Sequence, residues 1–321
     1  MEILKEKWSG KISEITIGAT AQEGGTRSSK IMAGGESTLP FLIQEGGMPN
    51  PPVIAMEVLD SEPADWPEAL KEPFKKVLKD PVEWALVCQN EFKASLLCLK
   101  LAGAHPDSGN RTPDQCAELV KNILKKVSVP LVILGCGDDD KDNLVLPKVS
   151  EAAKGERCLL GDVTEKNYKT LVASCIADGH NIIAESPIDV NIAKQVNILI
   201  SEMGFPLDKI VINPTIGALG YGMEYAYSIM ERARCAALIG DKMLAMPFIC
   251  FVGQEAWRAK EAKTPVSLIP EWGDENRRGI LWEAATATCM LQAGADILIM
   301  RHPKAIEATR SYINKLMKKG E

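Results

Sequence analysis

Short runs of apolar, often β-branched residues alternate with longer amphipathic stretches along most of the chain. This alternation is typical of repeated βα units, in which a buried parallel strand is followed by a helix. The apolar runs predict strands at 53–59, 95–102, 131–135, 158–161, 181–185, 209–213, 248–252 and 297–300. The amphipathic stretches predict helices at 81–93, 113–127, 142–154, 165–178, 189–203, 222–240, 278–293 and 303–318.

Residues that typically begin and end helices support these element positions. Thr112 followed by Pro113 has the form of an N-cap with proline at the first helical position. Gly155, Gly179 and Gly204 each fall just after a predicted helix, where a left-handed C-cap favours glycine. The next strand begins within a few residues of each glycine. Eight such units predict an α/β fold, a (β/α)8 TIM barrel over residues 51–321, whose longer βα loops carry function at the C-terminal ends of the strands.

Two regions fall outside a minimal barrel. Segments 11–17 and 27–33 flank a glycine-rich turn at 18–25 and predict a β-hairpin, within an N-terminal extension over residues 1–50. We expect the hairpin to cap the lower end of the barrel or to lie along its side. Segment 253–276 is predicted to be a long βα loop that contains Trp257 and Trp272, and loops of that length in a compact domain are usually functional or disordered.

Composition narrows the possible functions. The chain of 321 residues has a formal net charge of −6, which argues against binding to a nucleic-acid backbone. No signal peptide and no apolar run of about 20 residues is visible, so we expect a cytoplasmic protein with no membrane contact. The nine cysteines are scattered singly, without the clustering that iron–sulfur or structural zinc sites need. We therefore expect this chain itself to ligate no metal.

The three histidines do not complete a catalytic set. His105 and His302 follow predicted strands two and eight, and a structural or partner-contact role is favoured for both over acid–base catalysis. His180 precedes strand five and is expected to be a loop residue on the bottom face. The acidic run at 138–140 suits a solvated helix cap better than a divalent cation site.

The most informative local pattern is NPTIGALGYGMEY at 213–225, directly after predicted strand six. Three glycines in six residues before a helix allow the backbone to approach something large and flat, with amide donors at the helix start. A glycine-rich turn also serves close helix packing, and spacing alone does not separate the two interpretations.

Longer strings carry a specific resemblance. GGTR (24–27), GGESTLPF (34–41), PPVIAMEVLD (51–60), NPTIGALGYGMEY (213–225), WGDENRRGILWE (272–283) and AGADILIMRHPKA (293–305) closely resemble the small subunit of the corrinoid iron–sulfur protein. The same family includes the delta subunit of the archaeal acetyl-CoA decarbonylase/synthase complex. The resemblance extends over essentially the whole chain.

The resemblance implies a carrier subunit, not a stand-alone catalyst, in the methyl branch of the reductive acetyl-CoA pathway of anaerobes. Family members pair one-to-one with a large subunit that holds a [4Fe–4S] cluster, and a cobalamin-type corrinoid lies between that subunit and the top of the small-subunit barrel. Cobalt accepts a methyl group from methyltetrahydrofolate through a separate methyltransferase and passes it to acetyl-CoA synthase. The scattered cysteines agree with a cluster that belongs to the partner.

We expect no catalytic residue in this chain and predict which loops face the corrinoid and the large subunit. They are the loop after strand six, the loop after strand two and the start of the loop after strand seven. The predicted contact residues are Asn213, Thr215, Ile216, Gly217, Ala218, Gly220, Tyr221, His105, Asp107, Asn110, Gln254 and Trp257.

Two alternatives remain open. The first is a pterin-binding methyltetrahydrofolate methyltransferase of related barrel fold, which would hold the pterin with Asp and Asn side chains at strand ends. Only Asp162 and Asn213 are obvious candidates for that role. The second is an assembly scaffold that never touches the cofactor.

Overall fold

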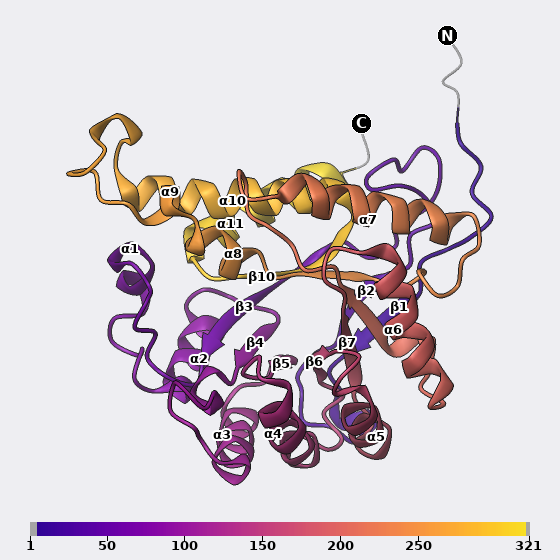
Figure 1. The fold of residues 1–321 in the computed structure, drawn as a ribbon, viewed down its shortest axis with the longest axis horizontal. Helices are drawn as coiled ribbons and strands as arrows, with labels where there is room; N and C mark the ends of the chain where they lie inside the picture. The colour runs from indigo at the N-terminus through magenta and orange to yellow at the C-terminus, as the bar shows by residue number, and fades with distance from the viewer. Residues whose placement is uncertain (1–4, 319–321) are drawn as a thin grey trace.

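The computed structural model describes residues 5–318 and confirms the predicted fold class. Within these residues, parallel strands close into a barrel in the order β10-β3-β4-β5-β6-β7-β8-β9, surrounded by helices (Figure 1). The strands are β3 (Val53–Leu59), β4 (Leu97–Lys100), β5 (Leu131–Leu134), β6 (Leu159–Val163), β7 (Asn181–Glu185), β8 (Ile210–Asn213), β9 (Phe248–Cys250) and β10 (Ala295–Met300). Each predicted strand is present. β3 and β7 have the predicted bounds, β4 is four residues shorter than expected, β5, β8 and β9 are one or two residues shorter, and β6 and β10 are longer.

The surrounding helices follow the predicted order. They are α2 (Pro81–Asn90), α3 (Pro113–Lys126), α4 (Asp139–Ala152), α5 (Tyr168–Asp178), α6 (Val190–Glu202), α7 (Met223–Leu238), α10 (Glu275–Ala293) and α11 (Pro303–Met317). α4 and α10 each begin three residues earlier than predicted, because Asp138 and Asp274 cap them by accepting backbone N–H bonds. A short helix, α1 (Glu68–Lys71), and two 3-10 turns, η2 (Glu72–Phe74) and η3 (Ala102–Ala104), were not predicted.

The segment predicted as a long loop at 253–276 is largely helical, so that prediction was wrong in form. α8 (Val252–Arg258) begins two residues after β9 ends and is followed by α9 (Lys260–Lys263) and by the 3-10 turn η5 (Pro270–Trp272). β9 is short for the same reason, because Val252 already belongs to α8.

The N-terminal hairpin closes the bottom of the barrel. β1 (Glu14–Ile17) and β2 (Ile31–Gly34) pair antiparallel, joined through η1 (Ala21–Glu23). Ile15 and Ile17 are buried in one cluster with interior residues of the barrel strands, and Asn181 at the start of β7 donates to the Thr16 carbonyl at 2.8 Å. Of the two placements expected for the hairpin, the structure shows the one beneath the barrel. A domain boundary near residue 50 stays a prediction.

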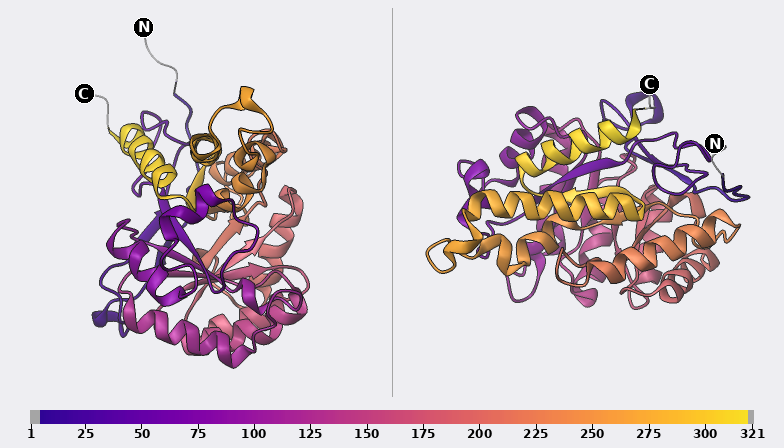
Figure 2. Two further views of the ribbon diagram at one scale, coloured as in Figure 1. Left: turned by 90° about the vertical axis from the view of Figure 1, so that its left-hand side faces the viewer. Right: turned by 90° about the horizontal axis from the view of Figure 1, so that it is seen from above.

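Alternation along the strands separates the two sides of the barrel wall. In β3, Ile54 and Val58 pack outward against the helices, whereas Ala55 belongs to the interior cluster. Successive side chains of a strand point to opposite faces, so every second residue fills the interior. Apolar side chains occupy the lower interior, and the polar residues that follow them reach the mouth at the C-terminal ends of the strands. Views from two further sides show the helices around this wall (Figure 2).

A buried ionic cluster ties the N-terminal extension to the barrel. Arg234 of α7 donates to Asp296 of β10 at 2.7 Å and lies 3.8 Å from Glu36. Its guanidinium also stacks 4.8 Å from the ring centroid of Phe248. Burial and the charge of Asp296 raise the pKa of Glu36 to about 9, so Arg234 chiefly compensates Asp296 at neutral pH. The cluster therefore depends on one buried cation.

We expect Arg234→Met to lower the free energy of unfolding by about 3–5 kcal/mol, because it leaves the Asp296 carboxylate buried without its cation. Urea denaturation followed by circular dichroism would measure the change. Arg232→Met, on an exposed position of the same helix, should change stability by less than about 0.5 kcal/mol. Equal and small effects of the two substitutions would contradict this role.

Candidate functional site

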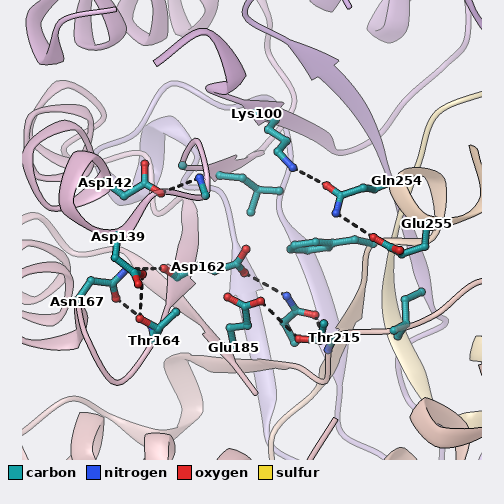
Figure 3. Close-up of a pocket in the computed structure, with 16 residues that line it drawn as sticks. Lys100, Asp139, Asp142, Asp162, Thr164, Asn167, Glu185, Thr215, Gln254 and Glu255 are labelled. Carbon is teal, nitrogen blue, oxygen red and sulfur yellow. Dashed lines mark hydrogen bonds between the residues drawn. The ribbon is translucent and has the colours of Figure 1, made fainter. Parts of the chain in front are cut away.

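A polar cavity of about 200 Å³ lies in the barrel mouth (Figure 3). Its walls come from the C-terminal ends of β4 to β9 and from the first turns of α4 and α8. The lining residues are Lys100, Leu134, Gly135, Gly137, Asp139, Asp142, Asp162, Thr164, Asn167, Glu185, Asn213, Thr215, Ile216, Phe251, Gln254 and Glu255. Such a position is where TIM-barrel proteins bind ligands.

Two carboxylates form the floor of the cavity. Asp162 accepts a long hydrogen bond from the Asn213 side-chain amide at 3.3 Å, and Glu185 accepts one from the Thr215 hydroxyl at 3.4 Å. Asn213 also accepts from the Thr215 backbone N–H at 3.1 Å, which fixes its amide orientation. The floor therefore presents carboxylate oxygens that protein donors satisfy only weakly, and a ligand with N–H or O–H donors would complement it.

Burial controls the charge of this floor. Burial and the nearby negative charge of Glu185 raise the pKa of Asp162 well above its usual range. Burial also raises the pKa of Glu185, and the charge of Asp139 adds to the effect. Two carboxyl groups that share a desolvated site do not both ionise easily. At least one carboxyl group of this pair therefore keeps its proton to a higher pH than a free side chain would.

A cation and an amide face the carboxylates from the opposite side. Lys100 Nζ donates to Gln254 Oε1 at 2.5 Å, and Gln254 Nε2 donates to Glu255 Oε1 at 3.0 Å. This chain of contacts links β4 to α8 across the mouth, as Figure 3 shows. The cavity thus offers acceptors on its floor and an ammonium at its edge, which suits an uncharged ligand with both donors and acceptors.

The acidic run at 138–140 contributes a cap and a wall, not a metal cluster. Asp138 caps α4 by accepting from the Lys141 N–H at 2.8 Å, as expected for a helix start. Asp139 accepts from the Thr164 hydroxyl at 3.0 Å and lies 3.5 Å from Lys166 Nζ. Among residues 5–318, no group of three or more His, Cys, Asp or Glu side chains is arranged to hold a metal ion.

Asp142, whose pKa is raised by burial, shapes the neighbouring wall. It accepts backbone N–H bonds from Cys136 at 2.8 Å and Gly137 at 3.0 Å. A Cβ on Gly135 would lie 2.3 Å from an Asp142 oxygen, so this position requires glycine. The turn after β5 is therefore fixed close to the cavity.

The structure brings together only some of the predicted contact residues. Those that line the cavity are Asn213, Thr215, Ile216 and Gln254. The others in the loop after β8 do not line it. Ala218 is buried, and Gly217 packs so tightly that a Cβ would meet the Tyr221 carbonyl at 2.3 Å. Gly220 has φ of +76°, and Tyr221 is 47% exposed on the rim.

The remaining predicted residues from other loops, His105, Asp107, Asn110 and Trp257, fall outside the cavity. His105 accepts from the Asp107 N–H at 3.2 Å, and Asn110 accepts from Lys141 Nζ at 2.6 Å, so this loop forms a separate part of the rim beside α4. Trp257 is only 3% exposed. Its indole N–H donates to Glu283 at 2.7 Å, and its ring stacks on His302 at 6.0 Å. In this structure Trp257 is a core residue and not a surface contact.

Two histidines have structural roles. His180 is fully buried at the bottom of the barrel, accepts from the Cys158 N–H at 3.1 Å and lies 2.9 Å from the Ser150 carbonyl. His302 caps α11 by accepting from the Lys304 N–H. Burial lowers the pKa of His302 to about 4, so its imidazole is neutral at physiological pH.

Lys100 and Glu185 line the cavity but were not predicted from the sequence. A simple signal was available, because each lies two positions after an apolar interior residue of its strand, Cys98 and Ile183 respectively. Because side chains alternate with a period of two along a strand, a residue two positions after an inward-facing one also faces inward. Asn213 obeys the same rule after Val211.

Comparison with known proteins identifies the family. The family model described as CO dehydrogenase/acetyl-CoA synthase delta subunit matches residues 14–309. This chain belongs to that family. The acetyl-CoA decarbonylase/synthase complex subunit delta of Archaeoglobus fulgidus is 34% identical over 320 residues, which cover 98% of this chain and 70% of the relative. The corresponding subunit of Methanopyrus kandleri is 36% identical over 300 residues, covering 93% of this chain and 73% of the relative.

Solved structures agree on the fold of this delta-family chain. Dihydropteroate synthase from Xanthomonas albilineans in complex with 7,8-dihydropteroate superposes with a TM-score of 0.56 at 11% identity, covering 88% of this chain and all of that one. At that identity the likeness concerns the barrel alone. The resemblance drawn from the sequence strings is confirmed by the family match, and the described residues contain no helix long and apolar enough to cross a membrane.

We expect Asp162→Asn to stabilise the protein at neutral pH. A carboxyl whose pKa is raised in the folded state loses its proton more readily when unfolded, so its penalty is absent below about pH 4 and grows as the pH rises. Replacement by a neutral amide should add about 1–2 kcal/mol at pH 7–8, with little difference near pH 4.

Thermal unfolding at several pH values would measure this gain, which should shrink as the pH falls. Asp65→Asn, an identical change at an exposed position, provides the control. A lower melting temperature for Asp162→Asn at pH 8 than for the unmodified protein would show that the carboxylate is not strained in the mouth.

Proposed function

We propose that this chain is the small, cofactor-sharing subunit of a corrinoid iron–sulfur methyl carrier that works with an acetyl-CoA decarbonylase/synthase assembly. The supporting observation is the family match over residues 14–309, which includes every strand of the barrel. Relatives that cover almost the whole chain are named as delta subunits of that complex. The partners of this proposal are a large corrinoid-carrying subunit with the [4Fe–4S] cluster, a methyltetrahydrofolate methyltransferase and acetyl-CoA synthase, all in the cytoplasm.

The mouth fits one side of a corrinoid better than a whole one. A cavity of about 200 Å³ lies below the usual range of pockets for cofactor-sized ligands, so the macrocycle would lie across the rim while its amide side chains reach down. Primary amides both donate and accept hydrogen bonds, and the cavity suits ligands that do both. Gln254, Asn213 and Thr215 would contact such side chains, and Tyr221 would flank the ring.

The chain's own residues would position the cofactor and exclude water. Bound cobalt supplies the methyl-accepting centre. The cavity lining contains neither histidine, serine nor cysteine, and its two hydroxyl groups, on Thr164 and Thr215, donate to the carboxyl groups of Asp139 and Glu185. Its carboxyl groups, whose pKa values burial raises, would hold amide groups of the cofactor without full negative charge.

Purification of the chain with its natural partners under anaerobic conditions tests the proposal. We expect a one-to-one complex with a larger polypeptide, with cobalt and iron in the complex and neither in the separated chain. Elemental analysis and the visible spectrum measure this. Turnover of methyltetrahydrofolate by the chain alone, without cobalt or a companion, would overturn the assignment.

We expect Gln254→Leu to lower corrinoid retention by the complex roughly five-fold, the equivalent of one lost hydrogen bond of about 1 kcal/mol. Cobalt per complex after dialysis measures retention. Asn90→Leu, an amide-to-leucine change on the exposed end of α2, should leave retention unchanged. Equal retention in both variants would remove Gln254 from the contact surface.

One observation favours a second candidate, the pterin-binding methyltransferase. Asp162, Glu185 and Asn213 give the cavity a more complete set of acceptors than the sequence indicated. A pterin ring presents adjacent N–H donors that a carboxylate can accept. Calorimetric titration of the corrinoid-free chain with methyltetrahydrofolate separates the candidates. The methyltransferase candidate requires that the chain bind methyltetrahydrofolate and that Asp162→Asn weaken this binding. An assembly scaffold that never touches the cofactor would instead show corrinoid spectra indifferent to Gln254→Leu.

A further inference from the structure

A buried carboxyl group lies behind one wall of the mouth. Glu283, in the middle of α10, is fully buried and does not line the cavity. The wall in front of it is α8, which packs against both α10 and β10 (Figure 1) and supplies Gln254 and Glu255 to the cavity. The contacts of this carboxyl group therefore bear on the shape of the mouth.

Three N–H groups donate to Glu283. The indole of Trp257, on α8, donates to Oε2 at 2.7 Å. The backbone N–H of Arg301 donates to Oε1 at 2.5 Å, and that of His302 donates to Oε2 at 3.1 Å. Arg301 and His302 directly follow β10. One carboxyl group thus joins α8 to the end of β10.

These contacts require an ionised carboxylate. A carboxylate accepts hydrogen bonds at both oxygens, whereas a protonated carboxyl group or an amide must direct a donor of its own toward one of the three N–H groups. Burial raises the pKa of Glu283 to about 7, and the three N–H donors and the charge of Arg301 oppose this rise. A buried carboxyl group held in this way ionises near neutral pH.

The neighbouring ionisable groups leave this balance to burial and to the three donors. Residues 279–287 of α10 contain no ionisable side chain besides Glu283. On α8, Glu255 and Arg258 pair with each other at 3.1 Å. After β10, Arg301 is charged, and burial and the charge of Lys304 lower the pKa of His302 to about 4.

α8 packs against this group without spare room. A Cβ on Gly253 would lie 2.7 Å from Arg301 Cγ and 3.1 Å from Glu283 Oε1. On α10, a Cβ on Gly279 would lie 2.4 Å from a ring carbon of Trp257. Both glycines let the helices approach closely, so the indole reaches Glu283 in one position of α8.

The position of α8 decides the geometry of the cavity edge. Gln254 lies three residues before Trp257, about one helical turn away. It accepts from Lys100 Nζ at 2.5 Å and donates to Glu255 at 3.0 Å. A movement of Trp257 away from Glu283 would therefore also move the amide that meets Lys100.

We propose that Glu283 is a positioning residue for the mouth, whose carboxylate holds α8 against the end of β10 and so places Gln254 opposite Lys100. The coupling of Glu283 to α8 is a property of this chain alone. Its consequence for a corrinoid rests on the proposed function. Because Glu283 does not line the cavity, it acts through Gln254 and not by contact with a ligand.

An NMR titration of the unmodified chain tests the coupling. With nitrogen-15 in its tryptophans, the indole N–H signal that Trp257→Phe removes should shift between about pH 5 and pH 9, as Glu283 ionises. The same signal in Glu283→Gln should stay constant over this range. A signal of the unmodified chain that does not move would refute the coupling.

Hydrogen exchange of the separated chain measures the hold on α8. In Glu283→Gln an amide N–H group faces the three donors, so peptides covering α8 should exchange at least about ten-fold faster, while those of α4 stay unchanged. Glu118→Gln, at an exposed position of α3, should alter neither. No acceleration in α8, or equal acceleration in α4 and α8, would contradict a specific hold on α8.

Cobalt retention by the complex tests the action through Gln254. Glu283→Gln should lower retention about as much as Gln254→Leu does, and the double variant should lose no more than the weaker single variant. Additive losses would show that Glu283 does not act through Gln254 and would overturn the proposal. If the complex contains no cobalt at all, the proposed function fails, whereas the NMR and exchange experiments still decide whether Glu283 holds α8.

Discussion

The site depends on the alternation of side chains inside a closed barrel. Eight parallel strands within residues 5–318 leave an interior that only side chains can fill, and each strand sends every second residue there. Ile183 and Val211 complete the apolar interior, and the next inward residues, Glu185 and Asn213, form the polar layer above it. A shift of one residue in either strand would reverse both layers, so the same constraint sets the core and the site.

The carboxyl groups of the cavity are compensated less directly than the buried carboxylate at the bottom of the barrel. At the bottom, Arg234 compensates Asp296 directly, and the hairpin covers the interior, so burial of charge there supports the fold. At the mouth, Lys100 is directed to Gln254, and Asp162 and Glu185 have only long hydrogen bonds. Buried carboxyl groups without close hydrogen-bond donors lower the stability of the fold. Such groups are typical of sites that bind a ligand.

The sequence predicted the parts of this structure that depend on local periodicity. Strand positions, helix order and the cap at Thr112 followed from apolar spacing and N-terminal signals, because these features depend on neighbouring residues. The helical nature of 252–263 was missed, since its turns are held by residues distant in sequence such as Glu283 and Arg278. Trp257 was expected at the surface for the same reason, although its partner Glu283 lies on α10.

The small volume of the cavity explains why the residues around its opening matter as much for ligand binding as the residues that line it. A mouth of about 200 Å³ can receive an edge or a side arm of a large cofactor, but it cannot enclose one. In the proposed assembly, most of the surface that covers a corrinoid would come from the larger subunit, and this chain would contribute contacts around the opening. Ordered contacts serve this purpose best, because each loop that is already fixed avoids an entropic cost on assembly. The glycine-rich loop after β8 and α9, joined through Tyr221 and Glu261, form such a prearranged rim.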